Sequence, residues 1–191
     1  MGKLKILVFA GSTRTDSYNK KLARVAADAV KKAGVEATYL DLRDIPLPIY
    51  DGDLEEKEFP ENATKLKKIF MEHQGLLIAS PEYNSSISGV LKNAIDWVSR
   101  LRPGEEDLAC FKGKVAGLMS ASPGALGGLR GLVTLRSILG NIQVLVIPQQ
   151  IAVSRAHEAF DAEGKLKDSK QQAAVEKIAA EVTKILTKLS A

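Results

Sequence analysis

A polar stretch near the amino terminus holds the residues of this sequence that are best suited to chemistry. It reads GSTRTDSYN and carries hydroxyl, guanidinium and amide side chains at Ser12, Thr13, Arg14, Thr15, Ser17 and Asn19. Hydroxyl groups donate hydrogen bonds to phosphate oxygens, and an arginine can pair with two of these oxygens at once. An apolar run precedes the stretch and a helical pattern follows it, so the free amides of the helix start would face the same point. The stretch predicts a phosphate-binding loop, with a plain turn capped by Ser17 or Asn19 as the alternative.

The glycine spacing in this loop excludes two common nucleotide motifs. A Walker sequence needs Gly-Lys-Ser/Thr after a glycine-rich run, and a dinucleotide fingerprint needs glycines two and five residues after the first. Thr13 and Asp16 stand at those two places after Gly11. We therefore expect a pocket for one terminal phosphate rather than for a pyrophosphate.

Two further loops carry groups that suit a flat ring. The first, SPEYNSSISG, begins at Ser80 and presents Glu82, Tyr83 and Asn84. A tyrosine ring offers a flat contact, and an asparagine amide pairs with carbonyl and N–H edges of a heterocycle. The second, SASPGALGG at residues 120–128, contains glycines that let a ligand approach the backbone. Each loop alone is also compatible with an ordinary turn or hinge.

The elements that must position these loops follow from the apolar pattern. Buried strands are predicted by short runs rich in Val, Ile and Leu, at residues 5–11, 35–42, 75–81, 114–121 and 142–149. Helices are predicted by apolar residues at helical spacing, at residues 19–33, 63–73, 88–101, 129–139 and 171–189. This alternation predicts one α/β domain over residues 1–191, a three-layer, doubly wound parallel sheet. The polar loops would share its carboxyl edge, where such sheets bind ligands. The long connection 44–60 is expected to be a lid or a partner contact.

Composition narrows the class of protein. The net charge of +4 arises from basic residues interspersed with acids, which argues against a nucleic-acid-binding protein. No apolar run approaches the roughly 20 residues that cross a bilayer, so no membrane span is expected and the cytoplasm is the simplest location. The single cysteine, Cys110, is expected to be a buried apolar group without a chemical role. His73 and His157 lack partners at metal-ligand spacing and are expected at the surface or at helix ends.

The loops together resemble those of the NADPH-dependent FMN reductase family of flavodoxin-like proteins, which includes chromate, quinone and azo-dye reductases. The resemblance rests on GSTRTDSYN, on PEYNSSISGVLKNAIDW from Pro81 and on SASPGALGG, each after a predicted strand. It extends over nearly the whole chain. It implies a five-stranded sheet in the flavodoxin-like order 2-1-3-4-5.

The resemblance also implies roles for particular residues. The FMN phosphate would be bound by Ser12, Arg14, Thr15, Ser17 and Asn19. The flavin ring would lie along Pro81, Glu82, Tyr83 and Asn84, with Ser120 near its polar edge. NADPH or NADH would supply a hydride, and a small molecule such as a quinone, chromate or an azo compound would accept electrons. The chemistry belongs to the cofactor, so no catalytic acid, base or nucleophile is expected.

Family members are usually homodimers or homotetramers with the flavin close to a subunit boundary. The helix through Trp97 would contribute to that contact, and Arg130 would reach across it. Trp97 itself is expected in core or subunit packing rather than against the cofactor.

Three alternatives stay open from the sequence. A reductase that releases FMN as a substrate for a monooxygenase would carry the same motifs. A flavodoxin-like electron carrier is typically strongly acidic, unlike this chain of charge +4. A receiver domain would need paired acids after the first strand and an aspartate after the third, where Gly11, Ser12 and Ser80 stand.

Overall fold

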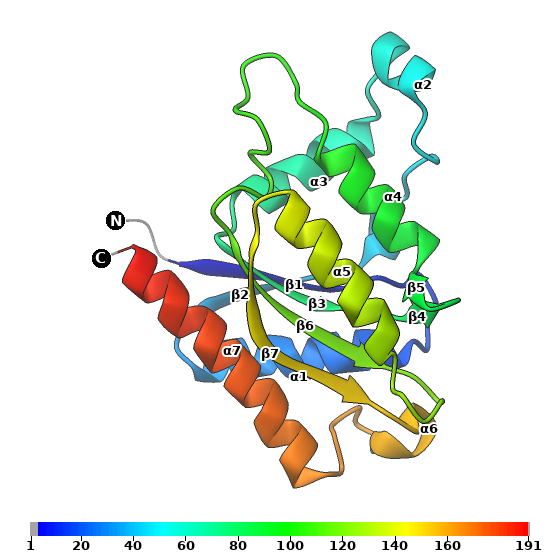
Figure 1. Ribbon diagram of the computed structural model, residues 1–191, viewed down its shortest axis with the longest axis vertical. Helices are drawn as coiled ribbons and strands as arrows, with labels where there is room; N and C mark the ends of the chain where they lie inside the picture. Colours follow the sequence, from blue (N-terminus) through cyan, green and yellow to red (C-terminus); the bar gives the residue numbers. More distant parts are fainter. Residues whose placement is uncertain (1–3, 191) are drawn as a thin grey trace.

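A five-stranded parallel sheet forms the centre of the computed structural model, which describes residues 4–190 (Figure 1). Its strands are β1 (Lys5–Ala10), β2 (Glu36–Leu40), β3 (Gly75–Ala79), β6 (Val115–Ala121) and β7 (Leu145–Val153). They lie in the order β2-β1-β3-β6-β7, and all neighbours are parallel. Counted over these strands, the order is the expected 2-1-3-4-5, and the doubly wound α/β class is confirmed.

Helices cover both faces of the sheet, as Figure 1 shows. One face is covered by α1 (Tyr18–Lys32) and α7 (Ser169–Leu189). The other is covered by α3 (Glu61–Met71), α4 (Gly89–Val98) and α5 (Leu129–Asn141). Shorter elements are the 3₁₀ turn η1 (Leu42–Asp44), α2 (Gly52–Lys57) and α6 (Ala156–Ala159). No helix in residues 4–190 combines the length and apolar character needed to span a membrane.

The central strands are apolar on both faces because helices lie on both faces. In β1, Ile6 and Val8 pack with the α1 and α7 layer, whereas Leu7 and Phe9 pack with the α3, α4 and α5 layer. All four side chains are buried. A strand that is covered twice has no solvent face to carry polar residues, which explains the continuous apolar runs of the sequence.

The last strand differs from its predicted bounds. It was expected at residues 142–149, but β7 begins at Leu145 and continues to Val153. Its register against β6 shifts between Ala116 and Leu118, and Pro148 lies in the irregular part of β7. Proline has no N–H for the ladder and is tolerated at an edge strand or a bulge, so the strand continues past it.

The long connection 44–60 is attached to α4. The carbonyl oxygen of Pro48 accepts hydrogen bonds from Trp97 Nε1 and Asn93 Nδ2, each at 2.8 Å. The rings of Tyr50 and Phe59 lie edge-on against Trp97, at centroid distances of 5.0 and 5.5 Å. Trp97 is fully buried, which confirms its expected place in the core. The connection also contains α2, which the sequence did not predict. The contacts of Pro48, Tyr50 and Phe59 with α4 hold the connection in place.

The amino edge of the sheet, where β3 and β6 begin, buries a group of titratable residues. His73 follows α3 and is buried, so the helix-end prediction is right but a surface position is wrong. Its ring nitrogens contact the carbonyl oxygen of Ile69 at 2.6 Å and Thr38 Oγ1 at 2.7 Å. Lys114 Nζ donates to the carbonyl oxygen of His73. Cys110 is buried as predicted, and its burial raises the pKa of the thiol to about 11, so it is not a thiolate at neutral pH.

Candidate active site

The polar loops that follow β1, β3 and β6 meet at the carboxyl edge of the sheet, on the right of Figure 1. They line a cavity of about 140 Å³. Its lining residues are Ser12, Arg14, Ser17, Tyr18, Asn19, Pro81, Glu82, Tyr83, Ala121, Ser122 and Pro123. Parallel strands end at one edge, so loops that are far apart in the sequence come together there.

The start of α1 forms one wall of this cavity. Ser17 is the N-cap residue, but its side chain makes no capping hydrogen bond, and no other side chain of the described residues caps this helix start. Ser12 and Ser17 are buried, and Ser12 Oγ accepts a hydrogen bond of 3.3 Å from the Arg14 amide. Arg14 is exposed at the mouth. Uncapped helix amides, two hydroxyl groups and a guanidinium together suit a phosphate monoester.

Asn19 uses its side chain within the protein. Its Nδ2 donates to the carbonyl oxygen of Ala121, and its Oδ1 accepts from the Ala121 amide, both at 2.9 Å. These hydrogen bonds attach the first turn of α1 to the end of β6. Although Asn19 lines the cavity, its amide group is therefore already paired.

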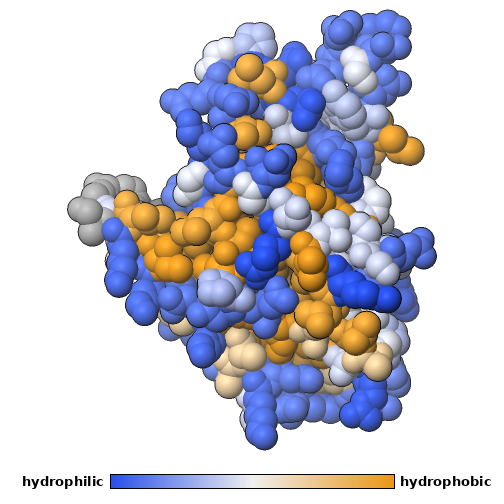
Figure 2. Space-filling model, in the orientation of Figure 1, coloured by the Kyte–Doolittle hydropathy of each residue, from blue (hydrophilic) through white to orange (hydrophobic). Residues whose placement is uncertain are grey.

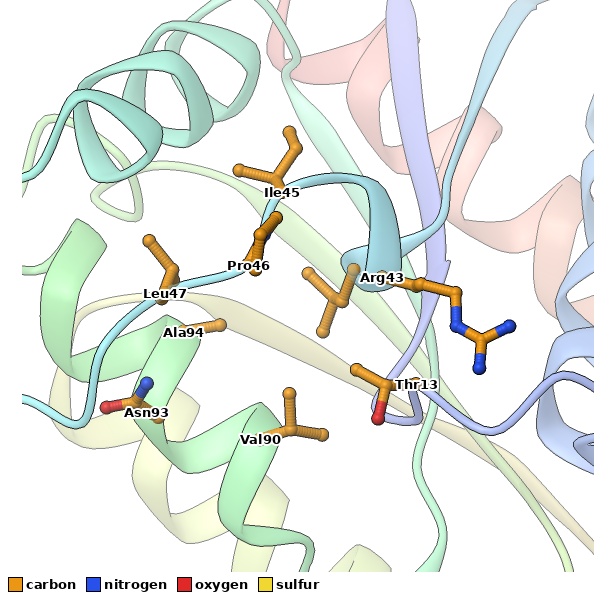
Figure 3. A pocket seen from close by; sticks show the side chains of 9 residues that line it. Thr13, Arg43, Ile45, Pro46, Leu47, Val90, Asn93 and Ala94 are labelled. Carbon is orange, nitrogen blue, oxygen red and sulfur yellow. The ribbon is translucent and has the colours of Figure 1, made fainter.

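Thr15 faces away from this cavity, toward the end of β2. Its Oγ1 accepts a hydrogen bond of 2.6 Å from Arg43 Nη1. Arg43 lies in η1 and was not among the predicted site residues. Figure 3 shows its guanidinium beside Thr13. Both residues line a separate cavity of about 300 Å³ between residues 42–47 and α4. The walls of that cavity are mainly apolar, formed by Leu42, Ile45, Pro46, Leu47, Val90 and Ala94.

The loop after β3 folds into a small hairpin that the sequence did not predict. Strands β4 (Glu82–Tyr83) and β5 (Ser86–Ile87) pair antiparallel. Asn84 and Ser85 join them with φ angles of 51° and 64°. Positive φ at both central residues is typical of the tight type I′ hairpin turn, and asparagine is well suited to its first position. Asn84 therefore has a conformational role in addition to its predicted contact with the ring.

The Glu82 carboxylate binds the start of α5. It accepts hydrogen bonds from the backbone amides of Arg130 and Gly131 at 3.0 and 3.2 Å, and from Arg130 Nε at 2.8 Å. Burial alone would raise the pKa of Glu82, but the Gly131 and Arg130 hydrogen bonds and the Arg130 charge outweigh it and lower the pKa. Glu82 thus stays ionised and caps α5 from a distant loop. In the described chain Arg130 pairs with Glu82, at 2.7 Å from Nη2 to Oε1.

A second cavity of about 400 Å³ continues along the same edge and shares Glu82 and Ser122 with the first. The hairpin tip, the glycine loop 124–128 and Arg130 complete its lining. Gly127 has φ 62°, and a Cβ there would lie 2.7 Å from the backbone of residues 152–154. The loop can pass this close to β7 only with glycine at that position. The second cavity is therefore open space beside bare backbone.

Ser120 lies beneath the glycine loop rather than in the lining of either cavity. It is fully buried, and its Oγ has no hydrogen-bond partner among the described residues. A Cβ at Gly128 would lie 1.9 Å from this oxygen, so the glycine loop covers it closely. An unpaired buried hydroxyl costs free energy, and such groups are most often kept where a ligand or a water satisfies them.

The structure adds residues that the sequence reasoning missed. Tyr18, Ser122 and Pro123 line the first cavity, and Ser122 also lines the second. All three lie inside the quoted motifs GSTRTDSYN and SASPGALGG, so their place in these motifs was the available signal. No group of His, Cys, Asp or Glu side chains within residues 4–190 could hold a metal ion. Uncapped helix amides, hydroxyl groups and Arg14 lie beside a second, mainly polar-lined cavity, and donors of these kinds fit the phosphate and the ring of FMN.

Comparison with known proteins agrees with this arrangement. Residues 4–158 match the family model described as NADPH-dependent FMN reductase. An NAD(P)H-dependent FMN reductase of Pseudomonas aeruginosa is 38% identical over 168 residues, covering 87% of this chain and 86% of the relative. A 2-hydroxy-1,4-benzoquinone reductase of a Burkholderia species is 34% identical over 164 residues, covering 85% of each chain.

A solved structure has the same fold over almost the whole length. The flavoenzyme NAD(P)H:(acceptor) oxidoreductase FerB of Paracoccus denitrificans aligns with a TM-score of 0.82 and 29% identity, covering 97% of this chain and 98% of its own. Sequence, fold and relatives therefore agree. The chain belongs to the NADPH-dependent FMN reductase family and is a flavodoxin-like oxidoreductase that uses FMN and NAD(P)H.

Proposed function

We propose that the protein passes electrons from NAD(P)H, through FMN held at the carboxyl edge, to a small-molecule acceptor, with a quinone as the first candidate. The observation that carries the proposal is the uncapped start of α1 beside Arg14, next to the open space over the glycine loop. The quinone assignment is supported by the Burkholderia relative and by a quinone reductase of Escherichia coli that is 37% identical over 147 residues. Chromate and azo compounds are further candidate acceptors.

At the phosphate end, the chain supplies donors to an anion. Ser12, Ser17 and Arg14 bind the phosphate oxygens together with the first amides of α1. Asn19 and Thr15 contribute in a different way, because their side chains are engaged with Ala121 and Arg43. We assign these two residues to holding the loop in place.

At the ring end, the chain would contact the flavin ring on one side and leave room for a second molecule on the other. When bound there, FMN would supply the hydride and electron transfer that the side chains themselves cannot. Pro81, Tyr83 and Asn84 flank the ring, and Glu82 contributes through its backbone because its carboxylate is bound to α5. Ser120, whose unpaired hydroxyl is covered by the glycine loop, would reach the ring's polar edge only with a shift of that loop. The glycine loop leaves room for the nicotinamide or the acceptor, and no side chain has to move a proton.

We also propose that the protein forms a homodimer or homotetramer. Leu129 and Val133 are 42% and 64% exposed and lie one turn apart on α5, directly after the glycine loop. Figure 2 shows apolar side chains gathered over this part of α5. Contiguous exposed apolar surface is typical of protein interfaces. Within the chain Arg130 pairs with Glu82, and a contact across the interface stays a prediction that the mass in sedimentation equilibrium and an Arg130→Ala variant would test.

Four finer points are part of the proposal. FMN stays bound through turnover, which predicts a yellow protein that retains flavin through desalting; loss of colour would favour release of FMN to a monooxygenase. The choice between NADPH and NADH is tested by steady-state turnover with each nucleotide. The cytoplasm, as the cell compartment, and a single domain over residues 1–191 stay predictions, checked by cell fractionation and by limited proteolysis.

Replacement of Arg14 by alanine tests the phosphate end. The variant should bind FMN about 10- to 100-fold more weakly, because hydrogen bonds to charged groups contribute about 1.5–3 kcal/mol. Riboflavin, which lacks the phosphate, should bind within about twofold of the parent protein. Both affinities are measured by quenching of flavin fluorescence. Lys31→Ala, which removes an exposed positive charge from the far end of α1, is the control. Equal losses for FMN and riboflavin would contradict the assignment.

A further inference from the structure

A buried ion pair joins the first turn of α1 to the end of β2. Lys20 Nζ lies 2.7 Å from Asp41 Oδ2, and the two side chains are 3% and 18% exposed. Lys20 is the third residue of α1, in the turn whose amides face the proposed phosphate site. A positive side chain in the first turn of a helix opposes the helix dipole, and burial of its ammonium group adds a desolvation cost. Helix stability alone therefore does not explain a lysine at this position.

Asp41 connects this pair to the phosphate loop by a second route. Its Oδ1 accepts a hydrogen bond of 3.0 Å from the Arg43 amide, which caps η1. The Arg43 side chain in turn donates to Thr15 Oγ1 at 2.6 Å. One carboxylate thus fixes the loop both before the helix, through Thr15, and inside its first turn, through Lys20.

The loop is also attached to two other strands. The Gly11 amide donates to the carbonyl oxygen of Ala79 at the end of β3, at 2.9 Å. Asn19 pairs with Ala121 at the end of β6. Those attachments lie on one side of β1, while Asp41 lies on the other side, at the end of β2. On the β2 side, the ion pair of Asp41 with Lys20 and the Arg43–Thr15 hydrogen bond oppose a tilt of the loop and helix start toward β3 and β6.

We propose that Lys20 and Asp41 are positioning residues that orient the start of α1 toward the flavin phosphate and so set the preference of the protein for FMN over riboflavin. The inference rests on the proposed function, because it takes the first loop as the phosphate site. Neither residue lines the phosphate cavity. Their effect is transmitted through the direction of the helix amides, and a donor array loses affinity for an anion when its donors are misaligned.

The decisive variant is the double replacement Lys20→Met with Asp41→Asn. It removes one positive and one negative charge, so the local net charge and the side-chain volumes are nearly unchanged, and no unpaired ion is left buried. The full-length chain, freed of flavin, is titrated with FMN and with riboflavin, and the ratio of the two dissociation constants is compared. We expect the preference for FMN to fall about tenfold in the double variant and in Lys20→Met alone. Urea unfolding should show that the double variant is more stable than the single one.

A variant near the other end of α1 serves as the control. Lys32→Met breaks the exposed pair of Lys32 with Glu176, 3.3 Å apart near the other end of α1, and should leave the preference unchanged. A double variant with the parental preference, within about twofold, would show that the pair serves stability only and would overturn the inference. A parent protein that binds FMN and riboflavin equally would instead overturn the proposed phosphate site, and the inference with it.

Discussion

Polar side chains lie at both edges of the sheet, but they differ in whether the protein provides their hydrogen-bond partners. At the amino edge, both ring nitrogens of His73 have partners, and Lys114 donates to the His73 carbonyl oxygen. Lys67 Nζ pairs with Glu105 at 2.6 Å and donates to the Arg100 carbonyl oxygen. At the carboxyl edge, Ser17 leaves the start of α1 uncapped, and Ser120 Oγ has no partner among the described residues.

Under the proposed function, this contrast distinguishes polar groups that stabilise the fold from those proposed to bind the ligand. Residue type alone would make His73, Cys110 and the buried lysines attractive candidates for chemistry. Their partners are all provided by the protein, so they stabilise the fold and have little left to offer a ligand. At the carboxyl edge, the first amides of α1 and the Ser120 hydroxyl have no side-chain partner among the described residues, so a bound ligand could provide one.

Lys67→Met tests the amino edge and has the largest expected effect, a loss of stability without a loss of FMN affinity. The variant removes the charged partner of the Glu105 carboxylate, which keeps its hydrogen bond from the Arg102 amide. Removal of one member of a buried ion pair costs about 3 kcal/mol of unfolding free energy. FMN affinity should stay within about twofold, because the two edges are separate. Urea denaturation and flavin titration measure the two effects. Lys65→Met on the same helix removes only an exposed pair with Glu61 and serves as control. A large loss of FMN affinity would refute the separation of the edges.

Glu82→Gln tests a side chain at the carboxyl edge whose hydrogen-bond partners are provided by the protein itself. We expect a loss of about 1–2 kcal/mol of unfolding free energy near pH 7, because charged hydrogen bonds to the α5 amides are weakened. The hydrogen bonds of Gly131 and Arg130 lower the pKa of Glu82 against the opposing effect of burial.

The pH dependence of that loss has a definite sign. With a pKa lowered from 4.5, Glu82 stabilises the protein fully above that value and loses its effect as the pH falls through the folded-state pKa. The difference between parent and variant should therefore stay constant from about pH 7 to about pH 5 and shrink as the pH falls further. Urea midpoints at several pH values measure it. A difference that is constant with pH would mean that Glu82 acts by packing rather than by charge.

Replacement of Asn84 by glycine and by alanine separates its two roles and has the smallest expected effect. Alanine should cost about 1 kcal/mol of unfolding free energy, because φ 51° strains a residue with a Cβ, whereas glycine should cost little. If the amide also contacts the ring, both variants should bind FMN a few-fold more weakly. Flavin affinity that is unchanged in the glycine variant would restrict Asn84 to the turn.

The sheet and its loops could be predicted because they depend on local patterns. Strands that are covered on both faces leave continuous apolar runs, and the polar loops follow them directly. The β4–β5 hairpin was missed because its strands have two residues each, too short for any periodicity. β7 was ended too early because the Pro148 irregularity resembles a strand end.

The partners of site residues could not be predicted for another reason. Glu82 is separated from Arg130 by 48 positions, and Asn19 from Ala121 by 102. Residue type shows that such side chains can bind something, but only the packed fold decides whether a ligand or the protein provides the partner. The same limit applies to Lys20, a plain lysine in the sequence and a buried ion-pair member in the structure.

The double hydrogen bond between Asn19 and Ala121 has a consequence for protein engineering. It attaches the proposed phosphate loop to β6, the strand that leads into Ser122 and the glycine loop. A change at Asn19 would therefore disturb both ends of the proposed site. A variant library aimed at new flavins or bulkier acceptors should keep Asn19 constant. Diversity belongs at Tyr83, whose side chain lines the first cavity, is 59% exposed and can change without straining the Asn84–Ser85 turn.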